Sequence, residues 1–297
     1  MKDAFLHYHR QYVLFLLLGL SCFYFQGSAH AEPKVLYDGY LIINTIPYTP
    51  PAKADFIPEI RVEKEKTYVE DDTGQLRRVV NTQKEGVLSY LGTGMREYQI
   101  YLPQDYDENK RYPVVMLLHD ANQTGVSLVE KWKATADRAG IILIGPSSLS
   151  LEWLIEPGTG DIIEAVLEDA KSQYPIHEDR VFLFGYGQGG ALASYVPLYK
   201  PELFTAVAVH QGGASEKNIT EGLENVSPKT PIAFFGNMKE ERTMRNLTKT
   251  AQYFARWRFP TQFYGFEKPD NWYYNNADDI NLEVMRYLAS HKISNKK

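Results

Sequence analysis

The sequence predicts an α/β fold in which a mostly parallel central sheet is flanked by helices. From about Arg96 onward, strand-like and helix-like stretches alternate along the chain, which is typical of such a sheet. Several of the strand-like stretches are continuous apolar runs, as expected for strands that are buried on both faces. The length of 297 residues suits one large α/β domain with shorter segments before it.

The strand candidates are short runs that are rich in β-branched and aromatic residues. They are Tyr98 to Leu102, Val114 to His119, Ile141 to Ile144, Val181 to Gly185, Ala206 to Val209, Ile232 to Phe235 and Gln262 to Phe266. The helix candidates are Ser127 to Ala139, Asp161 to Gln173, Gln188 to Tyr199, Thr243 to Arg258 and Asp279 to Ser290. Ligand crevices in open α/β sheets form at the carboxyl ends of the strands, so we expect the functional site there.

Residues 32–91 have a different pattern. Val35 to Ile46 is strand-like, a proline-rich break follows at Pro47 to Pro51, and Asp71 to Gly74 looks like the turn of a hairpin. We expect an N-terminal antiparallel β extension at the edge of the main sheet rather than a second domain. The predicted organisation is therefore a leader at residues 1–31, this extension at 32–91 and the α/β domain at 92–297.

The leader has the layout of a secretory signal peptide. Lys2 and Arg10 give a basic start, Tyr12 to Phe25 is apolar, and Ala29 to Ala31 is a small-x-small cleavage site. A membrane anchor is the alternative, but the apolar stretch is shorter than the about 20 residues that a spanning helix needs. We expect a secreted or periplasmic protein without a stable membrane span after cleavage. Cleavage would remove the only cysteine, Cys22, whose lipidation is a further alternative.

Composition and missing motifs exclude several classes of function. The formal net charge is −5 and no basic tract is present, so we expect no nucleic-acid binding. The sequence has no His-Glu-x-x-His, cysteine pair, phosphate loop or calcium loop. We therefore expect neither a metal nor a cofactor.

A small-residue turn follows the strand candidate that ends at Gly185. The run Gly185-Tyr186-Gly187-Gln188-Gly189-Gly190 joins that strand to a helix candidate. Strand, tight turn and helix are the layout of a nucleophile elbow, whose pattern is Gly-x-Ser-x-Gly. Gly187 stands where the serine would be, so the turn is present without its nucleophile. Glycine keeps such a turn because it reaches positive φ at little steric cost.

Several motifs together resemble secreted α/β-hydrolase-fold esterases of the polyhydroxybutyrate depolymerase and feruloyl esterase type. They are Arg96-Glu97-Tyr98 leading to Tyr101-Leu102-Pro103, the run from Tyr112 to His119, and the run from Tyr174 to Val181 before the elbow. The resemblance implies an α/β-hydrolase fold over roughly Arg96 to Ser290. It also implies a serine nucleophile, a histidine base and an aspartate that orients the histidine.

None of the three groups stands at its expected place. The resemblance puts the nucleophile at Gly187 and the acid at Lys239 or Glu240, after the strand candidate that ends at Phe235. It puts the base in a loop that contains no histidine and instead carries Lys268, Asp270 and Asn271. The catalytic triad is therefore predicted to be lost.

The oxyanion hole is altered as well. The resemblance assigns its two backbone N–H donors to Gln188 and to the loop at Asp120 and Ala121, where Asp120 replaces the usual glycine. A carboxylate would oppose a developing oxyanion unless the side chain turns away. The available histidines are weak replacements for the base: His119 and His210 end strand candidates, and only His210 is a minor candidate for the cleft.

Two functions remain open. The first is a secreted pseudoenzyme that binds a small-molecule, glycan or protein ligand; the residues expected near the inherited cleft are His119, Trp153, Tyr186, His210 and Trp272. Ordinary packing is the alternative role of these side chains. The second function is an active carboxylic ester hydrolase with a non-standard nucleophile, for which Ser147 and Ser148 are the candidates; their alternative role is that of turn residues.

Overall fold

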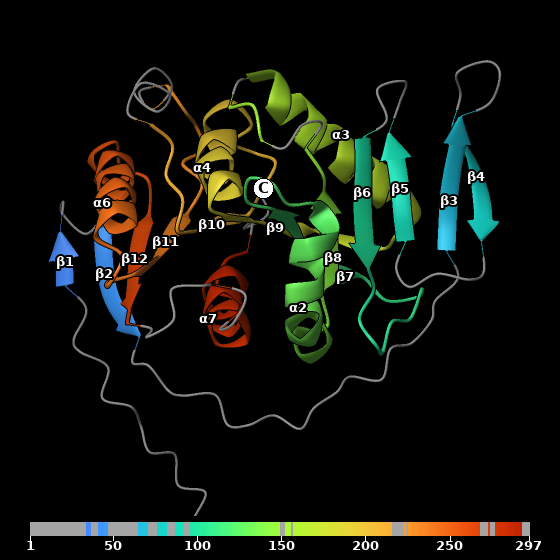
Figure 1. The fold of residues 1–297 in the computed structure, drawn as a ribbon, viewed down its shortest axis with the longest axis horizontal. Helices are drawn as coiled ribbons and strands as arrows, with labels where there is room; N and C mark the ends of the chain where they lie inside the picture. Colours follow the sequence, from blue (N-terminus) through green and yellow to red (C-terminus); the bar gives the residue numbers. More distant parts are fainter. Residues whose placement is uncertain are drawn as a thin grey trace, which may run out of the picture. The chain divides into compact units, whose positions relative to one another are not determined.

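The main feature of the fold is a ten-stranded sheet with helices on both faces (Figure 1). The computed structural model describes residues 34–36, 41–46, 65–70, 76–81, 87–91, 96–148, 152–155, 157–215, 223, 225–267, 273 and 277–292. All of them belong to the unit formed by residues 31–297. The predicted signal peptide lies outside the described residues.

Seven neighbouring strands of the sheet run parallel to one another. In spatial order they are β2 (Leu41–Ile46), β12 (Thr261–Phe266), β11 (Ile232–Asn237), β10 (Ala206–His210), β9 (Ile176–Tyr186), β7 (Tyr112–Leu118) and β8 (Ile142–Pro146). Antiparallel strands complete the two edges: β1 (Lys34–Leu36) beside β2, then β6 (Arg96–Tyr101) and β5 (Val87–Leu91) beside β8. A mostly parallel sheet is therefore confirmed.

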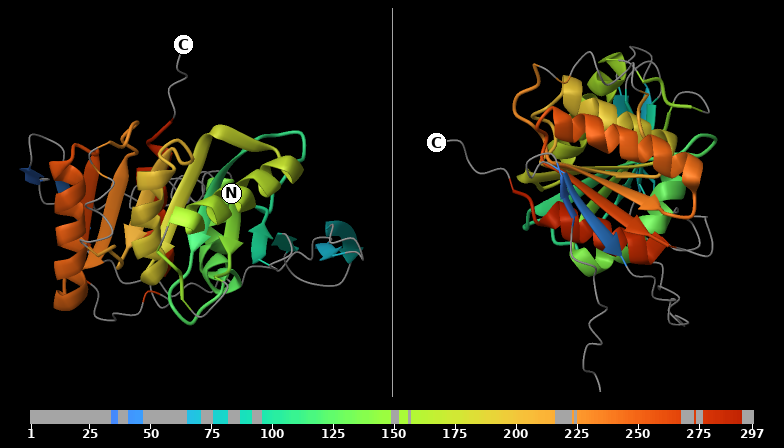
Figure 2. Two further views of the ribbon diagram at one scale, coloured as in Figure 1. Left: turned by 90° about the horizontal axis from the view of Figure 1, so that it is seen from above. Right: turned by 90° about the vertical axis from the view of Figure 1, so that its left-hand side faces the viewer.

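The helices divide between the two faces of this sheet. α3 (Pro157–Gln173), α4 (Gln188–Tyr199) and α6 (Glu241–Arg256) cover one face, and α2 (Gly125–Ala139) and α7 (Ala277–Ala289) cover the other (Figures 1 and 2). Each face carries its own apolar core cluster, one around Met116 and Leu183, the other around Trp132 and Phe184. Both sides of the central strands are consequently buried, which explains their continuous apolar sequences.

The N-terminal strands differ in part from the predicted antiparallel extension. β2 joins β12 in parallel register, with Leu41 opposite Thr261 and Ile46 opposite Phe266. β3 (Glu65–Glu70) and β4 (Leu76–Asn81) form a separate antiparallel pair around the predicted hairpin turn. The segment thus contributes to both edges of the main sheet and also forms a two-stranded sheet of its own.

Close backbone approach fixes the start of α4 against the sheet. A Cβ atom added to Gly189 would lie 2.0 Å from the carbonyl oxygen of Leu118 and 2.5 Å from that of His119. Only glycine permits this contact. As a result the first turn of α4 lies directly beside the end of β7, and the loop after β7 lies next to the elbow.

Candidate functional site

Gly187 links β9 to α4 with the backbone of a tight elbow. Its φ is 56° and its ψ is −118°, a conformation that residues with a side chain rarely adopt. The Gly187 N–H donates to the carbonyl oxygen of His210, 2.9 Å away, and the Gly187 carbonyl accepts the N–H of Ala191 at 3.1 Å. The turn is therefore tied to β10 on one side and to α4 on the other.

The carboxylate of Asp120 fills the space where a side chain at position 187 would begin. A Cβ atom built on Gly187 would lie 2.2 Å from Oδ1, 2.3 Å from Cγ and 2.6 Å from Oδ2 of Asp120. These separations are far below van der Waals contact. A nucleophilic side chain at position 187 and the present position of the Asp120 side chain are mutually exclusive.

The same carboxylate takes both N–H donors of the expected oxyanion region. Oδ1 of Asp120 accepts the backbone N–H of Gln188 at 2.7 Å and the N–H of Ala121 at 2.8 Å. One donor lies at the start of α4 and the other in the loop after β7. Two backbone N–H groups that converge on one point are suited to a negatively charged oxygen. The Asp120 side chain turns into this region rather than away from it.

His119 is held between two backbone groups. The Ser148 N–H donates to Nε2 at 3.1 Å, so Nδ1 carries the proton of the neutral ring and donates to the Asp120 carbonyl oxygen at 2.7 Å. The side chain is fully buried, and burial lowers the pKa of His119. Both ring nitrogens are engaged, so His119 connects the loop after β7 to the loop after β8.

Trp153 closes the network around that loop. Its indole Nε1–H donates to the His119 carbonyl oxygen at 2.8 Å, and its backbone N–H donates to Oε1 of Gln188 at 2.8 Å. The indole ring lies 4.8 Å from the imidazole of His119 between centroids. Trp153 is 5% exposed. It therefore packs on the oxyanion region and does not offer an open face to a ligand.

His210, at the end of β10, lies in an aromatic cage. The centroids of Tyr273, Tyr186 and Phe266 lie 4.7, 5.2 and 5.6 Å from its ring, and Phe184 lies at 6.5 Å. The side chain is fully buried, and neither ring nitrogen has a hydrogen-bond partner among the residues that the structure describes. Burial lowers the pKa of His210 from 6.5 to about 3. The ring is therefore neutral and enclosed, which is unsuitable for accepting a proton from a substrate.

Four of the expected binding residues thus pack in two pairs, His119 with Trp153 and Tyr186 with His210. His119, Trp153, Tyr186 and His210 are all buried. Trp272, the remaining candidate, lies outside the described residues, as do Lys268, Asp270 and Asn271 of the expected base loop. Ordinary packing, which the sequence analysis gave as the alternative to ligand binding, fits these four buried side chains.

The two residues at the expected acid position make contacts with side chains other than histidine. Glu240 precedes α6, and its Oε1 accepts the side-chain N–H of Gln211 at 2.7 Å. Lys239 is exposed, with Nζ 3.9 Å from a carboxylate oxygen of Glu267. Neither side chain contacts a histidine in these interactions.

The two serines considered as nucleophiles have structural hydrogen bonds. Oγ of Ser147 accepts the N–H of Gly125 at 3.1 Å, at the first residue of α2. Ser148 presents its backbone N–H to His119. These contacts fit turn residues that anchor neighbouring elements.

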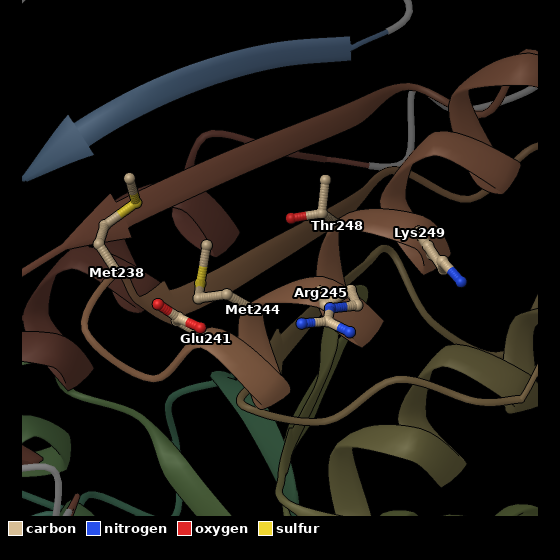
Figure 3. A pocket seen from close by; sticks show the side chains of 6 residues that line it. All are labelled: Met238, Glu241, Met244, Arg245, Thr248 and Lys249. Carbon is tan, nitrogen blue, oxygen red and sulfur yellow. The ribbon is translucent and has the colours of Figure 1, made fainter.

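A shallow hollow of about 490 Å³ lies elsewhere, along α6 (Figure 3). Its lining residues are Met238, Glu241, Met244, Arg245, Thr248 and Lys249. None of them belongs to the elbow or to the oxyanion region. Among the described residues, no group of three or more His, Cys, Asp or Glu side chains is arranged to hold a metal, and no helix is long and apolar enough to cross a bilayer.

Sequence reasoning missed the position of Asp120. The sequence shows Gly187 and Asp120, 67 residues apart, where the resemblance implies a serine and a glycine, without indicating that they share one space. The signal that could have found the pair is their joint departure from the esterase pattern. Two substitutions at the two sides of one small site are expected to compensate each other sterically.

Comparisons with known proteins agree with this fold. No family model matches the chain. The probable feruloyl esterase C of Aspergillus niger is 28% identical over 149 residues, and the feruloyl esterase C of Emericella nidulans is 25% identical over 149 residues. Each match covers 48% of this chain and 53% of the relative. The chain thus spans about half the length of the curated relatives it matches.

Solved structures extend the similarity at the level of fold. A ferulic acid esterase superposes with a TM-score of 0.57 at 17% identity, covering 70% of this chain and 98% of the other. A thermostable esterase superposes with a TM-score of 0.56 at 16% identity, covering 76% and 70%. The protein has the α/β-hydrolase fold. It is related to the α/β-hydrolase superfamily, and its relatives there are carboxylic ester hydrolases.

Proposed function

We propose that this protein is an exported, catalytically inactive member of the esterase-like α/β-hydrolases that acts by binding a ligand. One observation carries the proposal: the Asp120 carboxylate occupies the side-chain space at Gly187 and accepts both backbone N–H groups of the oxyanion region. The place of the nucleophile and the place of the oxyanion are filled by one residue of the protein itself.

Ester hydrolysis by the serine mechanism needs both of these places. The attacking oxygen must stand at the elbow, and the carbonyl oxygen must receive N–H donors as it becomes negative. A substrate carbonyl would have to displace the Asp120 carboxylate from these two N–H donors. Because the carboxylate belongs to the same chain, it is always close to the donors, and its hydrogen bonds are stronger than those of a neutral carbonyl. In subtilisin, removal of a single oxyanion donor lowers the turnover rate about 10²- to 10³-fold. Here both donors already bind the Asp120 carboxylate.

No described histidine replaces the base. His119 has both ring nitrogens hydrogen-bonded, and His210 is enclosed by aromatic rings. His177 lies beside Asp179 at the start of β9, and His291 bonds the Tyr287 carbonyl after α7. The sequence of the loop between β12 and α7 contains no histidine. Among the described residues, no histidine is therefore available at the elbow to accept a proton from a nucleophile.

The ligand is proposed from the relatives and the expected export. The curated relatives are named feruloyl esterases, so feruloyl esters and feruloylated glycans are the first ligands to test. A protein ligand is the further possibility that the sequence left open. Export through the signal peptide at residues 1–31 would place the protein in the periplasm or outside the cell.

Incubation with p-nitrophenyl acetate, methyl ferulate and a fluorophosphonate probe tests the proposal, with an active feruloyl esterase as positive control. We expect background turnover and no mass increase in intact-protein mass spectrometry. Saturable turnover, or stoichiometric labelling that is lost in Ser147→Ala, Ser148→Ala or Asp120→Ala, would overturn it. In that case the active hydrolase with a non-standard nucleophile is the correct function.

A further inference from the structure

We propose that the exposed face of α6 binds an acidic polysaccharide, a chain of uronic acid sugars. The site consists of a cationic row, formed by Arg242, Arg245, Lys249 and Arg256, and of the hollow beside it. None of these residues belongs to the elbow or to the oxyanion region. The inference therefore goes beyond the proposed function and concerns a different part of the molecule.

The four cations form a straight row along the helix. Arg242, Lys249 and Arg256 follow one another at intervals of seven residues, and Arg245 stands between the first two. With about 3.6 residues per turn and a rise of about 1.5 Å per residue, they start within an arc of about 60° and extend over about 21 Å. All four are exposed, and α6 is the outermost helix on its face of the sheet (Figure 1). A linear ligand can contact such a row along its whole length.

The cations of the row differ from those on other helices, because they have no carboxylate partner. On α2, α3 and α7 a basic side chain pairs with a glutamate three positions earlier: Lys133 with Glu130, Lys171 with Glu168 and Arg286 with Glu283. Within the described part of the chain, no ion pair joins a side chain of the row to a carboxylate. The formal net charge of the whole chain is −5, so these uncompensated cations form a local surface suited to an anionic ligand.

The hollow along α6 shares Arg245 and Lys249 with the row (Figure 3). Its volume of about 490 Å³ is large enough for a small ligand or one unit of a polymer. The other lining residues are apolar or able to form hydrogen bonds: Met238, Met244, Thr248 and Glu241. Methionine side chains adapt to irregular apolar surfaces, and a hydroxyl or a carboxylate can bind the hydroxyl groups of a ligand. A sugar ring presents C–H and hydroxyl groups together, so it can use both kinds of lining.

Other anionic partners fit this face less well. Duplex DNA has one charge per about 1.7 Å of its axis, whereas consecutive cations of the row are about 4.5 to 10.5 Å apart along the helix. A stable protein interface needs an apolar centre, and of the exposed large hydrophobic residues in the described part of the chain only Met238 lies here. A uronic acid chain carries a single carboxylate on each sugar ring. Its sparse charge fits the row, and its rings fit the hollow.

Binding of a fluorescein-labelled oligogalacturonate to the full chain tests the site, with fluorescence anisotropy as the readout. The oligomer is chosen long enough to span the row. We expect saturable binding at low ionic strength that disappears at about 1 M salt, where the Debye length falls to about 3 Å. The methyl-esterified oligomer has the same sugar rings without their charges and should not bind.

Two double variants with the same change in net charge separate the row from the general field of the protein. Arg245→Ala/Arg256→Ala removes two cations of the row, and Arg138→Ala/Arg286→Ala removes two exposed arginines from α2 and α7, on the opposite face of the sheet. The first should raise the dissociation constant about fivefold to tenfold, and the second less than about twofold. Alanine suits a helix, and an unchanged far-UV circular dichroism spectrum checks that both variants are folded.

The outcomes are independent of those for ester hydrolysis. Absence of oligogalacturonate binding, or an equal loss of affinity in the two double variants, would overturn the site. Tighter binding of poly-L-glutamate would assign the face to an acidic protein segment, and tighter binding of duplex DNA would show a general polyanion surface; either result would also overturn the proposal. Esterase activity of the unmodified protein would overturn the proposed function and leave this binding measurement intact.

Discussion

The two sides of the elbow contain two fully buried histidines in opposite environments. On the side of the oxyanion region, His119 has a hydrogen bond at each ring nitrogen. On the side of β10, the ring of His210 has no hydrogen bond within the described part of the chain and is surrounded by aromatic rings. The carbonyl of His210 nevertheless accepts the Gly187 N–H, so both residues are structurally connected to the same turn.

This difference shows that the turn is stabilised in two distinct ways. Around His119 and Asp120, buried or half-buried polar atoms are paired, and loss of one partner leaves the other unsatisfied. Around His210, stability comes from apolar packing, and the unpaired nitrogens are a cost that the fold tolerates. Isosteric loss of hydrogen bonding should therefore be harmful on the first side and nearly harmless on the second.

The largest effect is expected when a side chain is introduced at Gly187. Gly187→Ser places Cβ within 2.6 Å of the Asp120 carboxylate and at a positive φ, so the carboxylate must leave its two N–H donors. We expect a loss of about 4 kcal/mol in the free energy of unfolding, measured by urea denaturation, from lost charged hydrogen bonds and backbone strain. Esterase activity should not appear, because no histidine stands ready to activate the serine.

A double-mutant cycle checks the cause of this loss. In Asp120→Gly/Gly187→Ser the serine has room, so the double variant should be at least about 2 kcal/mol more stable than the sum of the single effects predicts. Additive effects would show that the two positions do not share one space. A large gain in turnover by Gly187→Ser would show that a base has been overlooked.

A pair of ring-preserving substitutions compares the two histidines directly. His119→Phe should cost about 2 to 4 kcal/mol at pH 7, because the Asp120 carbonyl and the Ser148 N–H both lose their partner. His210→Phe should change the free energy of unfolding by less than about 1 kcal/mol. Removal of two buried, unpaired nitrogen atoms is stabilising, and this gain offsets the destabilising effect of packing a slightly larger ring. Equal losses in the two variants, measured by urea denaturation, would refute the distinction between the two sides.

The pH dependence of stability should depend on His210. Because burial lowers the pKa of His210 from 6.5 to about 3, the unfolded chain binds a proton that the folded protein does not bind between these values. This contribution to stability is complete above pH 6.5 and falls by up to about 1.4 kcal/mol per unit as the pH drops towards 3. His210→Phe should reduce the slope between pH 6.5 and 4.5 by one proton, and the slope due to His119, whose pKa burial also lowers, should persist. An unchanged slope would contradict an enclosed, neutral His210.

The sequence predicts the parallel part of this fold well because local composition determines it. The apolar runs of β7 and β10 are short and rich in β-branched residues, which favours buried strands, and the elbow follows from small residues at fixed spacing. The extension of β9 back to Ile176 is not evident, because His177 to Arg180 are polar residues at the less buried beginning of that strand.

Features that depend on contacts between distant segments cannot be predicted from local sequence. The parallel pairing of β2 with β12 joins residues more than 200 positions apart, and nothing local in Leu41 to Ile46 specifies a direction. The position of Asp120 in the oxyanion region is another example, because it follows from the close approach of α4 to β7 that Gly189 permits. The predicted loss of the triad, in contrast, comes from the sequence alone, because that prediction requires only the identities of single residues.

The smallest effect tests how far the polar network extends beyond Asp120. In Gln188→Ala the backbone N–H that binds Asp120 is retained, but the side-chain Oε1 that accepts the Trp153 N–H is lost. Trp153 is almost fully buried, so this donor would be left without its partner at a cost of about 1 to 2 kcal/mol, or a fall in Tm of roughly 2 to 8 °C. Gln188→Glu keeps an acceptor for Trp153 and should recover part of the loss despite its added charge. A Tm of Gln188→Ala equal to that of the unmodified protein would limit the network to His119, Asp120 and their direct partners.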